Sequence, residues 1–246
     1  MYNRTRPNIG GHMLLWIYAI LTLVPIYWLV VGSLQPHAEM YSPNPAVYPR
    51  QASLNNFVSL FTETRITTWF FNSVVVSAGA IVVGLFICSL TGYVFAMFEF
   101  KGKRPIFWTV LASVTIPEIV MIIPVYRLMI GFGLVNTHLA LILPYSMNIF
   151  GIFFLKQYFH MSLPIELIQS ARVDGANEFL IYRKIAIPLA TAGLAVMTIF
   201  LWLNSWINYF WPLIMIRTNE MFTLPLGLAT LYANPWDLDY GQLMAG

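Results

Sequence analysis

Five long apolar stretches, separated by more polar segments, make up most of the chain. They cover residues 13–34, 69–97, 105–131, 137–159 and 189–216. A helix needs about 20 apolar residues to cross a hydrocarbon core of roughly 30 Å, so each stretch is long enough to span a membrane. Because the stretches are continuous rather than alternating, they are not typical of barrel strands. The pattern predicts an all-α fold, a polytopic transmembrane helical bundle with five spans.

The composition points to the same class. Apolar residue types make up 59% of the 246 residues and charged types 9%, against roughly 45–50% and about 25% in a soluble domain. So few charges cannot cover this much apolar side chain, which excludes a soluble globular protein. The single cysteine, Cys88, excludes an internal disulfide framework. We expect no metal site, no cofactor and no binding of nucleic acid.

The basic residues predict the orientation, because cytoplasmic loops carry an excess of Lys and Arg. With the amino terminus inside, nine basic residues fall on the cytoplasmic side: Arg4, Arg6, Lys101, Lys103, Arg104, Lys156, Arg172, Arg183 and Lys184. Four fall on the outer side: Arg50, Arg65, Arg127 and Arg217. We therefore expect a cytoplasmic amino terminus, an external loop over residues 35–68 and a cytoplasmic segment over residues 160–188.

The segment 160–188 predicts two short helices joined by a sharp turn. Ser162 is placed to cap the first helix, and Gly175 suits a left-handed position that ends it. Asp174 or Asn177 is placed to cap the second helix. The apolar residues of the segment have no obvious core of their own, so one interpretation is an amphipathic hairpin lying on the lipid surface.

The residue order in this segment also resembles the EAA loop of ABC importer permeases. It reads Pro-x-Glu, then Ala-x-x-Asp-Gly-Ala, then Ile-x-x-Pro-Leu, with Gln169 and Ser170 where the family has Glu-Ala. The resemblance implies a loop that docks on a cytoplasmic ATPase. The docking residues that it implies are Glu166, Ala171, Asp174, Gly175, Ala176, Ile185 and Pro188.

Two further stretches resemble the maltose-type, sugar-importing branch of these permeases. One reads Ile-Pro-Val-Tyr-Arg-Leu-Met from residue 123 and Gly-Phe-Gly-Leu-Val-Asn-Thr from residue 131, and the other Trp-Ile-Asn-Tyr-Phe-Trp-Pro from residue 206. The resemblance implies a bacterial inner (plasma) membrane permease subunit of a binding-protein-dependent sugar importer, with residues 1–246 as one permease domain. The implied partners are a second homologous permease, cytoplasmic ATP-binding subunits and an extracytoplasmic sugar-binding protein.

Hydrolysis of ATP would belong to such a partner. The chain contains no Gly-x-x-x-x-Gly-Lys-Ser/Thr loop to cradle nucleotide phosphates, so we expect no enzyme activity of its own. Two alternatives stay open. An importer of glycerol phosphate or peptides would share this architecture, although a phosphate favours cationic residues and Arg127 is the one candidate. A secondary transporter would leave the Asp-Gly-Ala hairpin unexplained.

Four residues are candidates for the transport path. Glu118 lies about 13 residues into the third stretch, where a carboxylate costs about 2.5–3.5 kcal/mol on the insertion scale and favours a cavity or the protein interior. Asn204, Asn208 and Trp211 fall at i, i+4 and i+7, a stripe whose amides and ring suit a sugar. The alternatives are a carboxyl bonded to the partner permease and polar packing between helices.

The resemblance also concerns the end of the chain. The family has a sixth span, and residues 242–246 resemble its opening but fall short of about 20 apolar residues. We therefore expect the sixth span to be truncated in this sequence and the natural protein to be longer.

Overall fold

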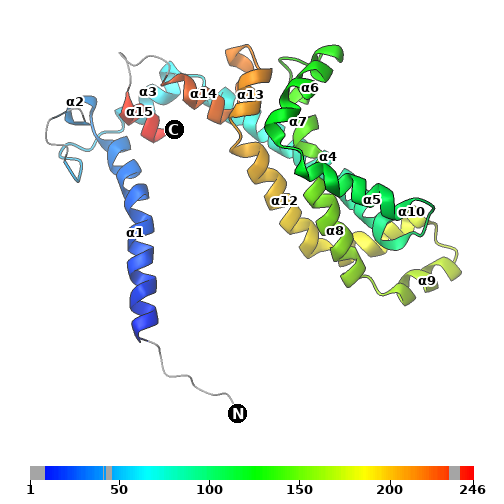
Figure 1. Cartoon of the computed structure of the whole chain (residues 1–246). Coiled ribbons are helices and arrows are strands. Elements are labelled where there is room, and N and C mark those ends of the chain that lie inside the picture. Colours follow the sequence, from blue (N-terminus) through cyan, green and yellow to red (C-terminus); the bar gives the residue numbers. More distant parts are fainter. Residues whose placement is uncertain (1–8, 41, 43–45, 233–238) are drawn as a thin grey trace. The chain divides into compact units, whose positions relative to one another are not determined.

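The computed structural model describes residues 9–40, 42, 46–232 and 239–246, and the elements in these ranges are all helices (Figure 1). Two continuous helices are long and apolar enough to cross a membrane, α1 (Ile9–Leu34) and α4 (Ile66–Met97). They coincide with the first two predicted spans. Three further pairs of helices are bent at a short break, so these residues contain up to five candidate spans when each pair counts as one.

The third stretch is not the continuous helix that its hydropathy predicts. Its two halves meet at an angle of 106°. Ile116 is extended, with ψ of 119°, because the residue before a proline is disfavoured in the helical region and Pro117 follows it. The parts are α5 (Lys103–Ala112), the short 3-10 turn η1 (Ser113–Thr115) and α6 (Glu118–Gly131).

The fifth stretch is also interrupted, which corrects the continuous span expected over residues 189–216. Helix α12 (Thr191–Trp206) ends three residues before α13 (Phe210–Met215) begins. Pro212 explains the restart, because a proline cannot donate the helical hydrogen bond and is tolerated in a first turn. The fourth stretch forms α7 (Leu139–Ser146) and α8 (Ile149–Ser162), bent by 45°.

Helices α4, α8 and α12 run beside one another in the larger of two compact units, residues 68–226 (Figure 1). One apolar cluster joins them to the segment after α8, through the buried side chains of Tyr93, Leu155, Phe159, Ile168, Ile181, Met197 and Leu201. A second cluster joins α4 to α6, α7 and α13, through Val76, Met129, Leu141, Trp211 and Met215. The helices that carry the candidate residues are therefore fixed against α4.

The segment after α13 is tied to the beginning of α4. The ring nitrogen of Trp69 donates to Asn219 Oδ1 at 2.9 Å, and Asn72 Nδ2 donates to the carbonyls of Glu220 and Phe222 at 2.8 and 2.9 Å. This segment contains the 3-10 turn η3 (Asn219–Met221) and leads into α14 (Leu224–Thr230).

The smaller unit comprises residues 1–67 and 227–246. Its described part contains α1, α2 (His37–Met40), α3 (Asn55–Glu63) and α15 (Tyr240–Ala245). Asn56 is buried and its side-chain amide donates to the carbonyls of Ser33 and Gln35, both at 2.9 Å. These bonds fasten α3 to the end of α1, so the polar stretch after α1 is partly a folded cap.

Candidate functional site

A cavity of about 670 Å³ lies between α6, the α7–α8 junction and the α12–α13 break. All four residues that the sequence nominates for the transport path line it: Glu118, Asn204, Asn208 and Trp211. The single helical stripe that we expected for Asn204, Asn208 and Trp211 does not form, because α12 ends at Trp206. The break in the helix turns Asn208 and Trp211 toward the same space as Asn204, so the structure brings these residues together by a different geometry.

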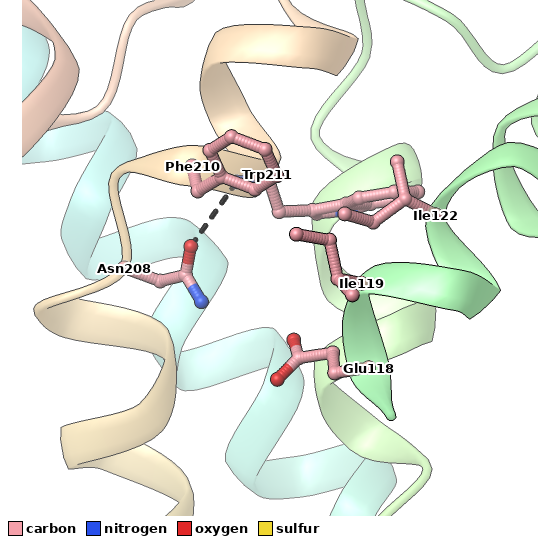
Figure 2. Close-up of a pocket in the computed structure, with 6 residues that line it drawn as sticks. All are labelled: Glu118, Ile119, Ile122, Asn208, Phe210 and Trp211. Carbon is pink, nitrogen blue, oxygen red and sulfur yellow. Dashed lines mark hydrogen bonds between the residues drawn. The ribbon is translucent and has the colours of Figure 1, made fainter. Parts of the chain in front are cut away.

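A smaller cavity of about 320 Å³ adjoins the first and shares Glu118, Asn208 and Trp211 with it. Figure 2 shows the Glu118 carboxylate and the Asn208 amide pointing into the space between α6 and the α12–α13 break. Glu118 opens α6, directly after the bend at Pro117. The proline break therefore aims this carboxylate into the cavity.

The side-chain amides of Asn204 and Asn208 each use one polar atom in a hydrogen bond to the backbone and keep the other polar atom available. Asn208 Oδ1 accepts a hydrogen bond from the Trp211 backbone nitrogen at 3.2 Å, and Asn204 Nδ2 donates to the Phe200 carbonyl at 3.1 Å. Asn208 thus retains its amino group and Asn204 its carbonyl oxygen. The Trp211 ring is fixed by its own nitrogen, which donates to the Ala140 carbonyl at 3.0 Å.

Tyr145 is a cavity residue that the sequence reasoning missed. Its hydroxyl is buried and has no hydrogen-bond partner in the described part of the chain, and the side chain lines the same cavity as Glu118. Two aromatic side chains in contact, Phe150 and Phe200, line it as well, with ring centroids 5.0 Å apart and ring planes tilted by 41°. No periodicity marks Tyr145, because it lies beside Pro144 near the end of α7.

The segment 160–188 forms the predicted helix, glycine turn and helix. Gly175 adopts φ of +82°, a left-handed angle that glycine takes without strain. Of the two candidate caps, Asn177 is the one used, since its Oδ1 accepts from the Leu180 backbone nitrogen at 2.8 Å. The elements are α9 (Ile165–Val173), α10 (Glu178–Ile181), a π-helical turn η2 (Tyr182–Ala186) and α11 (Ile187–Leu189).

The prediction that Ser162 caps the first helix of this hairpin is wrong. Helix α8 continues through Ser162, whose hydroxyl is buried without a partner in the described part of the chain. Pro164 occupies the position before α9 instead, without a side-chain hydrogen bond. The longer α8 explains the difference, because a residue inside one helix is not free to begin the next.

The residues nominated for docking fall into two groups. Glu166, Asp174, Gly175 and Pro188 are exposed. Ala171, Ala176 and Ile185 pack against the apolar cluster around Tyr93 and Ile168. The first group is open to a partner, whereas the second holds the hairpin against the helices of the bundle.

An ion pair closes the hairpin across its turn. Arg172 Nε donates to Glu178 Oε1 at 2.7 Å, and this hydrogen bond raises the pKa of the Arg172 guanidinium. A second such pair lies in the basic loop after α4, where Lys103 Nζ lies 2.7 Å from Glu99 Oε1 and lowers the pKa of that carboxyl. No group of three or more potential metal ligands occurs in the described ranges.

The hairpin is also bonded directly to α4. The hydroxyls of Ser89 and Tyr182 are 2.6 Å apart, and the Tyr182 ring lies 5.3 Å from that of Tyr93. Ser89 and Tyr93 are one helical turn apart on α4, while Tyr182 begins the π-helical turn. A displacement of the hairpin would therefore act on α4 through these contacts.

Together, the apolar helices, the cavity between their breaks with its few polar side chains, and the hairpin define a multi-pass membrane protein of the transport class. The family of binding-protein-dependent transport system inner membrane components matches residues 84–244. The chain belongs to this family. It is a multi-pass permease of the inner membrane, and ATP hydrolysis lies in a partner subunit.

Two curated relatives and one solved structure illustrate the likeness. The arabinooligosaccharides transport system permease protein AraQ of Halalkalibacterium halodurans is 40% identical over 231 residues, covering 93% of this chain and 82% of the relative. The diacetylchitobiose uptake system permease protein NgcG of Streptomyces coelicolor is 31% identical over 238 residues, covering 96% and 78%. A crystal structure of a bacterial ABC transporter that imports the acidic polysaccharide alginate shares the fold, with a TM-score of 0.84 at 22% identity, covering 100% and 91%.

Proposed function

We propose that the chain imports oligosaccharides as one permease of a binding-protein-dependent ABC transporter. The cavity that joins a carboxylate, two amides and aromatic rings carries this proposal, because sugars are held by hydrogen bonds to hydroxyls and by contact with ring faces. The relatives AraQ and NgcG are named for oligosaccharide transport, which supports the same substrate class.

The cavity forms half of an alternating-access pathway in this proposal. Glu118, Asn204, Asn208 and Trp211 line the substrate path, and a second homologous permease supplies the other half. An extracytoplasmic sugar-binding protein delivers the solute. Residues 1–246 belong to a single permease domain and contribute five spans to it, with the amino terminus in the cytoplasm and residues 35–68 outside.

The hairpin 160–188 is the cytoplasmic docking loop for the ATP-binding subunits. Its exposed apolar side chains support this role. Val173 is 88% and Phe179 63% exposed, and both lie near the glycine turn of the hairpin, in a segment that is not part of the long apolar stretches. Glu166, Asp174, Gly175 and Pro188 contact the ATPase, while Ala171, Ala176 and Ile185 anchor the hairpin. Closure of the ATPases on ATP would then pull α4 through the Ser89–Tyr182 contact.

Uptake by a strain that lacks its own copy of this permease tests the proposal. The panel consists of labelled arabinotriose, diacetylchitobiose, lactose and glycerol 3-phosphate, which are solutes or solute classes in the names of the relatives. We expect restored, ATP-dependent uptake of at least one of the three sugars and none of glycerol 3-phosphate.

A chain with Asn204→Leu and Asn208→Leu is the matched variant, because it keeps the size of both side chains and removes the amides. We expect it to assemble but to lose at least about tenfold in uptake, the effect of two lost hydrogen bonds of about 1 kcal/mol each. Uptake of glycerol 3-phosphate alone would instead favour the phosphate alternative, and uptake independent of the ATPases would favour a secondary transporter.

A further inference from the structure

The side chains that line the cavity carry formal charge of one sign only. Among the described residues that line it, Glu118 is the only one with a formal charge, and none is Lys, Arg or His. The Glu118 carboxylate makes no hydrogen bond or ion pair within the described ranges, and its side chain is exposed to the cavity. The other polar lining groups are neutral hydroxyls and amides, on Ser113, Tyr145, Asn148, Asn204 and Asn208.

This arrangement matches the hydrogen-bonding chemistry of a neutral sugar. Each sugar hydroxyl donates one hydrogen bond and accepts others, and a carboxylate is a pure acceptor that makes strong, charge-assisted bonds to such donors. The amino group of Asn208 offers a donor in the same space. A neutral oligosaccharide could therefore satisfy the Glu118 carboxylate and this donor at once.

Charge repulsion opposes the binding of an acidic sugar in the same cavity. A uronate carboxylate or a phosphate would enter an apolar-walled cavity that already holds one negative charge and offers no cation to compensate it. Two like charges roughly 12 Å apart repel by about 1.4 kcal/mol at an effective dielectric constant near 20. That repulsion corresponds to about a tenfold loss of affinity.

We propose that Glu118 acts as a charge filter, so that the cavity accepts neutral oligosaccharides and rejects acidic ones. The proposal rests on the proposed function and adds a substrate class to it. Rejection through a repulsive group is a recognised route to specificity, because discrimination depends on the difference between two affinities.

Binding to the complete importer, reconstituted without its binding protein, tests the filter directly. The probes are arabinotriose, which is neutral, and trigalacturonate, which carries three carboxylates. Saturation-transfer NMR titration gives a Kd for each probe with the wild type, with Glu118→Gln and with Glu99→Gln. The last variant is the matched control, since Glu99 is 89% exposed, pairs with Lys103 and does not line the cavity.

In the wild type and in Glu99→Gln, we expect trigalacturonate to bind at least about tenfold more weakly than arabinotriose. In Glu118→Gln, the affinity for trigalacturonate should rise by about that factor, whereas the affinity for arabinotriose should fall, because the amide oxygen of Gln accepts a weaker hydrogen bond from a sugar hydroxyl than the carboxylate does. Equal binding of both probes to the wild type overturns the proposal, as does absence of arabinotriose binding or a gap that Glu118→Gln leaves unchanged.

Copurification of the second permease with Glu118→Gln separates the filter from a structural role. If the partner permease no longer copurifies, the carboxylate belongs to the interface between permeases and the filter is overturned. Failure of the filter is also distinct from failure of the proposed function, because oligosaccharide uptake by the wild type then persists while the difference between the two probes is absent.

Discussion

At the scale of the residue, the hairpin depends on the backbone angle of Gly175. A β-branched side chain at φ of +82° is strained by about 1–3 kcal/mol, although no neighbouring atom obstructs it. We expect Gly175→Val to insert normally but to lose both uptake and copurification of the ATPase, each by about tenfold. Gly131→Val is the matched control, because Gly131 also faces open space and lacks a positive φ. Normal uptake by Gly175→Val would contradict the docking role.

The same hairpin shows which residue-level features the sequence can predict. Gly175 was predictable because a glycine after a helical pattern is a strong signal for a left-handed end. The cap could be narrowed only to Asp174 or Asn177, and the structure selects Asn177. Ser162 misled the prediction because its side-chain chemistry favours a cap, whereas its position depends on how far α8 extends. Tyr145 was missed because burial without a partner is a tertiary property.

At the scale of the element, close packing between α4 and α8 depends on Gly92. A Cβ atom at Gly92 would lie 2.9 Å from the backbone nitrogen of Lys156, which cannot move without shifting α8. We expect Gly92→Ala to destabilise the chain by about 1–3 kcal/mol, the usual cost of overpacking. A lower midpoint of thermal unfolding in detergent would measure this. Gly131→Ala should leave the midpoint nearly unchanged, since nothing lies within 4 Å of its added Cβ. An equal lowering of the midpoint by both substitutions would contradict the packing argument, because helix propensity favours Ala over Gly and does not lower the midpoint.

The helices also show which structural features average hydropathy predicts and which it does not. Apolar length predicted α1 and α4 correctly, because a membrane span requires a minimum number of apolar residues. It could not predict the 106° bend before α6 or the break after α12, since average hydropathy does not depend on backbone direction. Pro117 and Pro212 were the visible signals. The nominated cavity residues came together because both breaks open toward the same space.

At the scale of the whole molecule, the exposed apolar surface of α1 indicates that the surroundings of the protein are apolar. Every large apolar side chain from Met13 to Val30 is exposed in the isolated chain. Such a surface is stable only against lipid or another apolar helix, because the apolar patches on soluble monomers rarely exceed a few hundred Å². This exposure agrees with the composition, which predicted a membrane protein before any element was assigned.

The proposed orientation of the chain rests on its basic residues and leads to the last prediction. In a Cys88→Ala background, Lys101→Cys and Arg50→Cys place single thiols at two exposed positions on opposite predicted sides. Cys88 is the single cysteine of the sequence, so the Cys88→Ala background contains no thiol and should not label from either side. We expect an impermeant maleimide added to intact spheroplasts to label Arg50→Cys, and to label Lys101→Cys only after permeabilisation, because the basic loop after α4 remains inside. Labelling of both variants in intact spheroplasts would overturn the proposed orientation.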